Sequence, residues 1–370
     1  MPVLPTTPTL AINGSFLVKP VTGVQRYARE MMAALAAQHP GQLAVLAPAG
    51  AIVPPEWPVV AIHDERRARL RPALWEQLRL PILFRRSGAR LLWSPSNIGP
   101  MSLREHAVTL HDASVFAGPQ WFSWQFRLWH RFVQRVVARR SRLVMTVSEF
   151  SEAELRRHGL VGPERAVHVV HCAVGGEIAA AAARPAPPRE PFVLFVGSVE
   201  PRKNLRSLLE AWCRIPASER GEWRLKIAGG AAKSFAQVVL PQVADAAVDF
   251  LGYVSDEDLI ALYRRASLFA YLSEYEGFGL PPLEAMSLGT PTLLSDIAVF
   301  RELYDGAASF VPPGSAAAIA AELSSLMHDE ARRAALSEAG QSRALRYDWG
   351  RSAERLWAAC MSTMEQGHAP

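Results

Sequence analysis

Short apolar runs alternate with amphipathic segments along the whole chain. In the first half the apolar runs predict strands at 10–13, 43–48, 58–63, 91–95, 107–111, 143–148 and 167–171. Apolar residues at helical spacing predict helices at 24–38 and 73–84, and a long helix after residue 121. In the second half, strands are predicted at 192–198, 225–230, 248–254, 268–273, 292–296 and 308–313, with helices from residues 205, 256 and 282. Such alternation is typical of parallel sheets covered on both faces, so we expect an α/β fold of two tandem Rossmann-like, doubly wound domains facing a cleft.

The composition changes most sharply at residues 180–191, AAAARPAPPREP. Four prolines there can neither continue a helix nor join a central strand. We therefore interpret 180–191 as a linker between an N-terminal domain, 1–179, and a C-terminal domain, 192–345. A C-terminal helix at 346–370 is expected to return to the N-terminal domain.

Length and composition indicate a globular protein with more than one core. The chain has 370 residues, of which 49 % are hydrophobic and 20 % charged, and about 150 residues per domain gives two domains. No apolar run of about 18 residues or export signal is visible, so we expect a cytoplasmic protein. Three widely separated cysteines, without CxxC spacing, predict a reducing compartment and no structural zinc.

Charge is divided unevenly along the chain. Residues 1–190 carry a net charge of +10 and the remainder carries −5. A basic half suggests an anionic partner, which charge alone leaves open between lipid, nucleic acid and a phosphorylated acceptor. No nucleic-acid-binding module is recognisable in that half, so we expect no nucleic acid.

The segment from residue 269 to residue 291 carries two candidate carboxylates, Glu276 and Glu284, beside a glycine-containing loop. An apolar strand runs into Gly277 and Gly279, after which Pro281 and Pro282 open a helix. Glu276 is expected in the loop and Glu284 in the first turn of the helix, where both could accept hydrogen bonds from ligand hydroxyl groups. The alternative is that Glu284 only complements the helix dipole.

A second strand, turn and helix follow at 195–204. Arg202 and Lys203 stand before a helix that Asn204 is expected to cap, so side chains and helix dipole would attract the same anion, such as a diphosphate. The alternative is a solvated turn with an ordinary capping residue.

The first domain has weaker signals. Gly23 opens the helix after the first strand, and a glycine there permits close approach to a ligand. His111 and Asp112 end the strand 107–111, where ligands bind in this architecture. A single histidine is more often structural, but this position favours function.

These segments together resemble the retaining glycosyltransferase family 4, of GT-B fold. Glu276 to Glu284 reproduce its E-x7-E motif, and VGSVEPRKNL, DFLGYVSDEDLIALYRRA and GTPTLLSD match further family segments. In the N-terminal half, TGVQRYARE, LWEQ and TLHDAS resemble bacterial mannosyltransferase-like members that build exopolysaccharide or O-antigen.

The resemblance implies roles for particular residues. Arg202 and Lys203 would hold the donor diphosphate, Glu284 the ribose, and Glu276 the donor sugar. His111 would meet the transferred sugar. The other donor-binding positions implied are Gly23, Gly197, Ser198, Val254, Gly277, Phe278, Gly279 and Leu280. Some members carry Arg where this chain has Ser198, so charge neutralisation would depend more on Arg202 and Lys203.

The implied reaction is a metal-independent, front-face hexosyl transfer, in which the diphosphate oxygen takes the proton of the acceptor hydroxyl. His111, Glu276, Lys203 and Arg202 would be the catalytic residues. No metal ion or cofactor is expected. GDP-mannose is the preferred donor, ahead of UDP-glucose and dTDP-rhamnose, and the expected acceptor is a polyprenyl-diphosphate-linked saccharide.

The rival interpretations are a glycogen-type phosphorylase, which would need a lysine-held pyridoxal phosphate, and a non-catalytic nucleotide-sugar-binding protein.

Residues 121–142 predict an amphipathic basic helix. Its apolar positions are Leu128, Trp129, Phe132, Val133, Val136 and Val137, and its arginines Arg127, Arg131, Arg135 and Arg139 recur every fourth residue. With Arg66, Arg67, Arg69 and Arg71, these arginines are hypothesised to rest on an anionic membrane surface without insertion. The alternative is a core-facing helix with solvated arginines.

Overall fold

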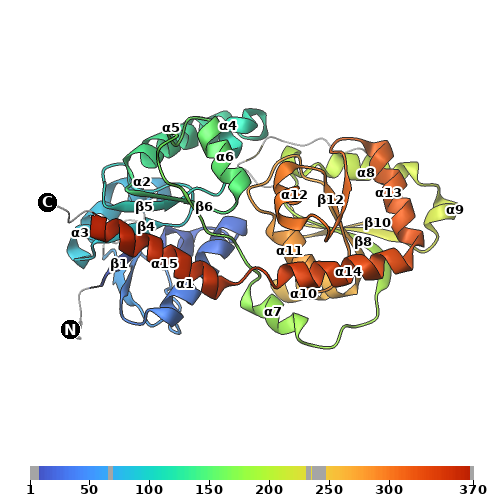
Figure 1. Cartoon of the computed structure of the whole chain (residues 1–370), viewed down its shortest axis with the longest axis horizontal. Helices are drawn as coiled ribbons and strands as arrows, with labels where there is room; N and C mark the ends of the chain where they lie inside the picture. Colours follow the sequence, from blue (N-terminus) through green and yellow to red (C-terminus); the bar gives the residue numbers. More distant parts are fainter. Residues whose placement is uncertain (1–7, 66–69, 231–234, 236–246, 367–370) are drawn as a thin grey trace. The chain divides into compact units, whose positions relative to one another are not determined.

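The computed structural model describes residues 8–65, 70–230, 235 and 247–366 and separates them into two compact units (Figure 1). Unit 1 comprises 1–117, 128–172 and 348–370, and unit 2 comprises 118–127 and 173–347. Each unit contains one parallel sheet, which confirms the α/β class.

Unit 1 contains a seven-stranded sheet in the order β3-β2-β1-β4-β5-β6-β7. The strands are β1 (Leu10–Asn13), β2 (Leu43–Ala47), β3 (Val60–His63), β4 (Leu91–Ser94), β5 (His106–Thr109), β6 (Leu143–Thr146) and β7 (His168–Val169). Leu10 of β1 pairs with Leu43 on one side and Leu91 on the other. Because helices cover both faces, strands such as β2 are buried throughout and read as continuous apolar runs.

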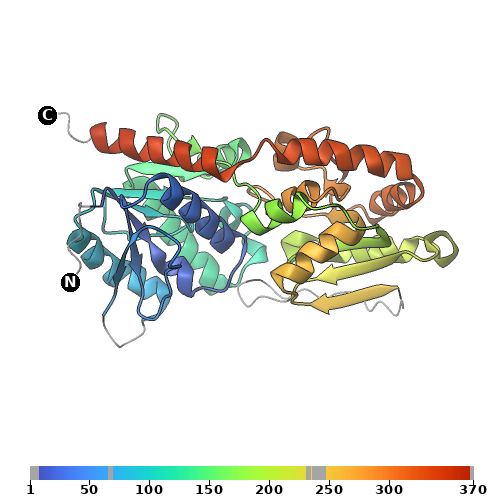
Figure 2. The same cartoon turned by 90° about the horizontal axis from the view of Figure 1, so that it is seen from below.

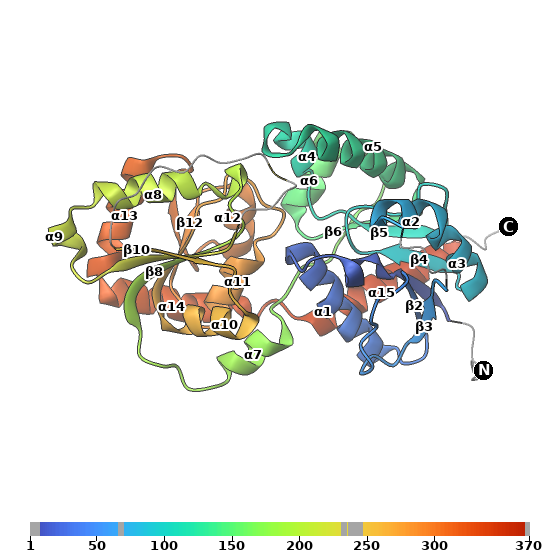
Figure 3. The same cartoon turned by 180° about the vertical axis from the view of Figure 1, so that it is seen from behind.

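The helices of unit 1 lie on opposite faces of this sheet. They are α1 (Gly23–Gln38), α2 (Pro72–Leu78), α3 (Leu80–Ser87), α4 (Ser114–Ala117), α5 (Trp124–Arg140), α6 (Glu149–Arg157) and α15 (Trp349–Gln366), with the 3₁₀ turns η1 (Gly14–Val18) and η2 (Pro119–Trp121), of which η2 and the start of α5 belong to unit 2. Figure 3 shows α2 and α5 on one face and α1 and α15 on the other. Right-handed crossovers in opposite directions along the sheet account for this division.

The helix predicted at 73–84 is two helices, α2 and α3, which meet at Arg79. Pro81, at the start of α3, has no backbone N–H to donate to the preceding turn, so the continuous helix expected from the apolar spacing is interrupted.

Unit 2 repeats the arrangement with six strands in the order β10-β9-β8-β11-β12-β13. They are β8 (Glu190–Val196), β9 (Arg224–Ala228), β10 (Val248–Gly252), β11 (Ala266–Tyr271), β12 (Thr292–Ser295) and β13 (Ser309–Val311). The helices are α7 (Gly176–Ala182), α8 (Leu205–Arg214), α9 (Ala217–Arg220), α10 (Asp256–Arg265), α11 (Leu280–Ser287), α12 (Ala298–Tyr304), α13 (Ala316–His328) and α14 (Glu330–Ala344), with the 3₁₀ turn η3 (Pro201–Lys203). The main core lies between the sheet, α8 and α13, around Trp212 and Phe195.

The predicted linker and the C-terminal helix pack in different units. Residues 180–191, which we interpreted as a linker, lie within unit 2, where the Arg189 guanidinium donates to the carbonyls of Tyr263, Ala266 and Leu288. In contrast, α15 packs along α1 in unit 1, as Figures 1 and 2 show in red and dark blue. Trp349 of α15 contacts the ring of Tyr27 at a centroid distance of 5.6 Å.

Among the helices of the described residues, none is long and apolar enough to cross a membrane. The hypothesised membrane-contacting residues Arg66, Arg67 and Arg69 lie outside the described residues.

Candidate functional site

The strand order of unit 2 reverses between β8 and β11, and the loops after these two strands carry the candidate residues. The strand that follows β8 in the chain, β9, lies on the side of β8 away from β11. The strand that follows β11, β12, lies on the side of β11 away from β8. Loops that diverge at such a switch point leave the carboxyl ends of the strands open to a ligand. The order therefore brings 197–204 and 273–280 to the same edge of the sheet.

Arg202 of η3 links the two loops. Its Nε and Nη2 donate to Oε1 of Glu200 at 3.2 and 2.8 Å. Its Nη1 donates to Oε2 of Glu276 at 3.0 Å and to the Tyr275 carbonyl at 3.1 Å. The Arg202 carbonyl accepts a backbone hydrogen bond of 2.8 Å from Glu274. The guanidinium is thus fixed from both sides.

Lys203 binds the other oxygen of the same carboxylate. Its Nζ lies 2.6 Å from Oε1 of Glu276 and also donates to the hydroxyl of Tyr271, which in turn donates to Oε1 at 3.1 Å. Burial alone would raise the pKa of Glu276, but Arg202, Lys203 and hydrogen bonds outweigh it and bring the pKa to about 2. Glu276 is therefore ionised at neutral pH. Burial raises the pKa of Tyr271 well above its usual value, so this hydroxyl stays protonated.

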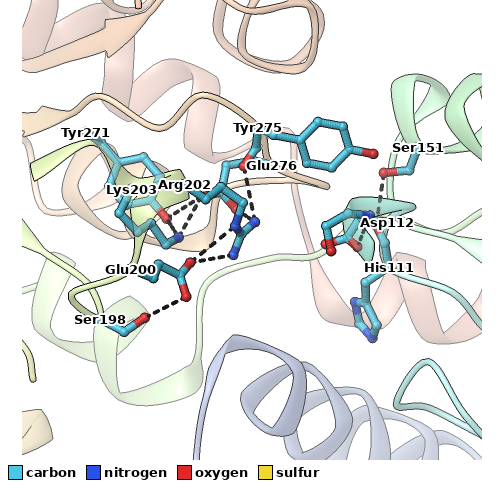
Figure 4. A network of polar contacts seen from close by, with 11 residues as sticks. His111, Asp112, Ser151, Ser198, Glu200, Arg202, Lys203, Tyr271, Tyr275 and Glu276 are labelled. Carbon is cyan, nitrogen blue, oxygen red and sulfur yellow. Dashed lines mark hydrogen bonds and ion pairs between the residues drawn. The ribbon is translucent and has the colours of Figure 1, made fainter. Parts of the chain in front are cut away.

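Two cations and two carboxylates thus form one compensated cluster, which we call the ion network: Glu200, Arg202, Lys203 and Glu276. All four side chains are at most 12 % exposed. Figure 4 shows them with Ser198, Tyr271 and Tyr275, connected by hydrogen bonds and ion pairs. The structure brings together three residues singled out from the sequence and adds Glu200 and Tyr271, which sequence reasoning missed. An acidic residue two positions before Arg202 was the available signal for Glu200.

The loop after β11 reaches its helix through a glycine in a left-handed backbone conformation. Gly279 has φ of +94°, and a Cβ atom there would lie 2.7 Å from the Phe300 ring. Its carbonyl accepts from the Tyr304 hydroxyl at 2.8 Å. Only glycine fits both constraints, so the backbone at the start of α11 is held in a fixed path. Gly277 and Phe278 of this loop are buried, while Leu280 is half-buried.

Glu284 lies deeper in α11 than expected. The helix begins at Leu280, so Glu284 is its fifth residue rather than part of the first turn, and the first turn has no acidic residue. This placement also removes the alternative in which Glu284 complements the helix dipole from the first turn. Its buried carboxylate accepts from the Tyr263 hydroxyl at 3.2 Å.

The prediction that the Asn204 side chain caps α8 is wrong. Asn204 precedes the helix, but its side chain makes no capping hydrogen bond, because the residue is left-handed with φ of 54°. A side-chain cap requires extended backbone at this position. The left-handed turn instead ends η3 directly after Lys203.

The remaining predicted residues of unit 2 flank the ion network or follow β10. Ser198 donates to Oε2 of Glu200 at 3.2 Å, and the Gly197 amide donates to the Ala228 carbonyl at 3.0 Å. Gly229 contacts Gly197 so closely that a Cβ atom would lie 1.9 Å from its carbonyl oxygen, a requirement that sequence reasoning missed. Val254 follows β10 and precedes α10, at the carboxyl end of its strand.

In unit 1, His111 is buried beyond the end of β5. Its Nε2 lies 2.8 Å from the Pro95 carbonyl, which can only accept, so Nε2 carries the proton. Burial lowers its pKa, and the neutral ring therefore offers Nδ1 as an acceptor. The backbone is fixed by Asn97, which accepts from the His111 amide at 2.6 Å, and by Ser151, which donates to the His111 carbonyl (Figure 4).

A further polar cluster of unit 1 follows β1. The fully buried Glu76 accepts from Lys19 at 2.9 Å and from Ser15. Burial, together with the charge of Lys19, lowers the pKa of His130 to about 4, against the opposing effect of Asp112. Sequence reasoning had used LWEQ, which contains Glu76, only as part of the family resemblance. Gly23 is the exposed first residue of α1.

Residues 179–343 match the family model described as glycosyl transferases group 1. The chain contains a glycosyltransferase group 1 domain. The match covers the switch point, the ion network and α11, so these features lie in the part of the glycosyltransferase that the family shares.

Curated relatives extend the similarity into unit 1. The chain is 29 % identical to O-antigen chain mannosyltransferase B of Escherichia coli over 362 residues, which cover 89 % of this chain and 93 % of the relative. It is also 29 % identical to O-antigen chain mannosyltransferase RfbU of Salmonella typhimurium, over 69 % of this chain and 71 % of the relative.

Solved structures share the fold. Sucrose-phosphate synthase from Thermosynechococcus elongatus matches with a TM-score of 0.74 at 21 % identity, covering 98 % of this chain and 100 % of that one. HepE of Anabaena in complex with UDP-glucose matches with a TM-score of 0.67 at 16 % identity, covering 96 % and 100 %. The fold of this glycosyltransferase is GT-B, as the family resemblance implied.

The ion network predicts a stability role for Glu200. The substitution Glu200→Gln replaces the charged acceptor of the Arg202 hydrogen bonds by a neutral one. It should lower the free energy of unfolding by about 1.5–3 kcal/mol. The midpoint of urea unfolding, followed by fluorescence, measures this. Glu210→Gln is the matched control, because Glu210 is exposed and paired with Arg206 on the surface of α8, where such pairs contribute about 1 kcal/mol or less. Equal midpoints for the two variants would contradict the role of Glu200.

Proposed function

We propose that this glycosyltransferase transfers mannose from GDP-mannose to a saccharide acceptor in the synthesis of a bacterial surface polysaccharide. The observation that supports a diphosphate donor is the pair of cations at the switch point of unit 2. Arg202 and Lys203 lie side by side at the carboxyl ends of β8 and β11. The names of two mannosyltransferase relatives support the sugar.

The donor diphosphate competes with Glu276 for its cations. In the structure Glu276 accepts from Arg202 through one carboxylate oxygen and from Lys203 through the other. A diphosphate carries the same kind of oxygen acceptors and more charge, so it can take over these hydrogen bonds. Glu276 is then released to accept a hydrogen bond from the donor sugar, while Glu200 continues to orient Arg202.

The proposed reaction retains the anomeric configuration and needs no metal. The acceptor hydroxyl attacks the anomeric carbon on the face that the nucleotide leaves, the bond to the diphosphate breaks, and a diphosphate oxygen takes the hydroxyl proton. Arg202, Lys203 and the N-terminal amides of α11 stabilise the charge that grows on the leaving group. His111, with Nδ1 as an acceptor, is assigned to a hydroxyl of the transferred sugar.

Unit 1 is assigned to the acceptor, which we propose is linked to polyprenyl diphosphate. Lys19 after β1 and Asp112 after β5, with Glu76 of α2 and His130 of α5, offer hydrogen-bond donors and acceptors. Since Glu76 already pairs with Lys19, the cluster suits uncharged sugar hydroxyls. The lipid-linked acceptor would be met at the cytoplasmic face of the membrane, where each basic residue near an anionic surface contributes about 1 kcal/mol.

Lys203→Ala tests the diphosphate assignment. Losing one charge-assisted hydrogen bond should weaken GDP binding by about 1.5–3 kcal/mol, or roughly 10- to 100-fold, in calorimetry. Lys226→Ala is the control, since Lys226 is a partly exposed lysine of β9 outside the ion network. Circular dichroism establishes that both variants are folded, and unchanged GDP affinity in folded Lys203→Ala would overturn the assignment.

Substitution of Glu276 and substitution of Glu284 should have different effects on GDP binding and on sugar transfer. Glu284→Gln is expected to weaken binding of GDP, because Glu284 is assigned to the ribose. Glu276→Gln is expected not to weaken GDP binding, because it removes the carboxylate charge that competes for Arg202 and Lys203, but it should lower the rate of sugar transfer. Calorimetry and a transfer assay on both variants measure the difference, and the reverse pattern would exclude this division.

The choice of nucleotide and sugar can be tested by thermal shift. A ligand at about 100 times its dissociation constant stabilises the folded state by about 2.7 kcal/mol, so GDP and GDP-mannose should raise the melting temperature. UDP-glucose and dTDP-rhamnose are the competing donors. Stabilisation by UDP without stabilisation by GDP would replace the proposed donor. Binding without turnover of any nucleotide sugar would favour a non-catalytic binding protein.

A further inference from the structure

Hydrogen bonds hold His111 at its backbone and at one nitrogen of its ring. Its amide donates to Asn97, its carbonyl accepts from Ser151, and its Nε2 donates to the Pro95 carbonyl at 2.8 Å. A single hydrogen bond tolerates a range of angles, so the bond at Nε2 does not by itself set the plane of the imidazole. The direction in which Nδ1 points therefore depends on what packs against the ring.

The ring of Tyr27 packs against the His111 imidazole. The ring centroids are 4.6 Å apart and the ring planes meet at 88°, an edge-to-face arrangement. Tyr27 is the fifth residue of α1 and has no exposed surface. Burial raises the pKa of its hydroxyl well above the usual value, so the side chain stays neutral beside His111. In the segment TGVQRYARE, the family resemblance gave a role to Gly23 but none to Tyr27.

A second aromatic residue, Trp349, packs against Tyr27. The two ring centroids are 5.6 Å apart, with an interplanar angle of 66°. Trp349 is the first residue of α15 and is buried, at 9 % exposure. The start of this helix is joined to α1 by Gln38, whose side chain donates to the Gly350 carbonyl at 2.9 Å. Three rings therefore follow one another from α15 through α1 to the end of β5, and we call Trp349, Tyr27 and His111 the aromatic series.

We propose that Tyr27 and Trp349 are positioning residues of the transfer reaction, which fix the His111 ring so that Nδ1 meets a hydroxyl of the transferred sugar. The inference rests on the proposed function, which assigns His111 to that hydroxyl, and extends it to two residues that act through His111. Misplacement of a group by about 1 Å can lower a rate about 100-fold. Because Trp349 opens α15, the C-terminal helix contributes to the site as well as to the core of unit 1.

Replacement of the two supporting rings tests the proposal. Tyr27→Leu and Trp349→Leu should each lower kcat for release of GDP from GDP-mannose about 10- to 100-fold. Tyr27→Phe keeps the ring and should retain most of the parental kcat. The affinity for GDP, measured by calorimetry, should be parental in all three variants, because the ion network assigned to the diphosphate lies in unit 2.

Trp357→Leu is the matched control. Trp357 is a second tryptophan of α15, and it stacks on His39 at the end of α1 with a centroid distance of 3.8 Å. Its replacement removes a comparable contact between α15 and α1 but leaves the aromatic series intact. Its kcat should therefore be parental once thermal unfolding has established the folded fraction of every variant.

The titration of His111 distinguishes positioning from a purely structural role. Burial lowers the pKa of His111, against the Pro95 hydrogen bond and the charge of Asp112. Loss of the Tyr27 ring should admit water, so the pKa should rise toward the ordinary value of about 6.5. NMR of histidine-labelled protein measures this, with the His111 signal identified by its loss in His111→Ala. The kcat of Tyr27→Leu should then fall further at about pH 6 than at about pH 8, since a protonated ring has no acceptor.

Two results would overturn the proposal. One is a parental kcat or a parental His111 titration in folded Tyr27→Leu. The other is an equal loss of kcat in Trp349→Leu and Trp357→Leu, which would reduce the effect to the packing of α15. If Tyr27→Leu does not fold, Trp349→Leu replaces it in both measurements.

Failure of the proposed function gives a different result. A parental kcat in His111→Ala would exclude the role of His111 itself, whatever its ring titration shows. Unchanged GDP affinity in Lys203→Ala would exclude the donor assignment and would leave the titration of His111 in the Tyr27 and Trp349 variants as the test of the aromatic series.

Discussion

Charge compensation between the loops after β8 and β11 determines how unit 2 can present a ligand site. Arg202 and Lys203 are nearly buried, and an unpaired charge in such a place would cost several kcal/mol. Glu200 and Glu276 provide the compensation from opposite sides, so each loop depends on the other for its conformation. The switch point supplies the geometry, because strands β8 and β11 are neighbours while the chain leaves them in opposite directions.

Much of this arrangement could be predicted from the order of residues. Alternating apolar runs predicted both sheets, and Arg202, Lys203 and Glu276, which the sequence assigned to one site, lie together in the structure. Their direct pairing could not be predicted, since a motif shows which residues approach a ligand but not which of them bind each other without it. Glu200 was missed for the same reason. Asn204 was misjudged because its capping ability depends on a backbone angle that its identity leaves open.

The helix α5 shows a different limit of sequence patterns. Leu128, Phe132, Val133 and Val137 all fit helical spacing, but they belong to two adjacent stripes, of which only one faces the sheet. Periodicity alone does not distinguish a wide buried face from a narrow buried face beside an exposed apolar one. The break between α2 and α3 is of a related kind, since apolar spacing continues through Pro81 although the backbone hydrogen bonds do not.

The position of α15 has a consequence for the order in which the protein can assemble. Leu356 and Cys360 of this helix are fully buried in unit 1, and the Ser352 hydroxyl donates to the His171 carbonyl at 2.8 Å. During synthesis, residues 349–366 emerge after all of unit 2, so the first unit to begin is the second to complete its core. Until then the face of α1 that α15 covers lacks its partner, so nascent unit 1 exposes apolar surface that the complete chain buries. Unit 2 needs no later segment except its neighbours in sequence and can fold first.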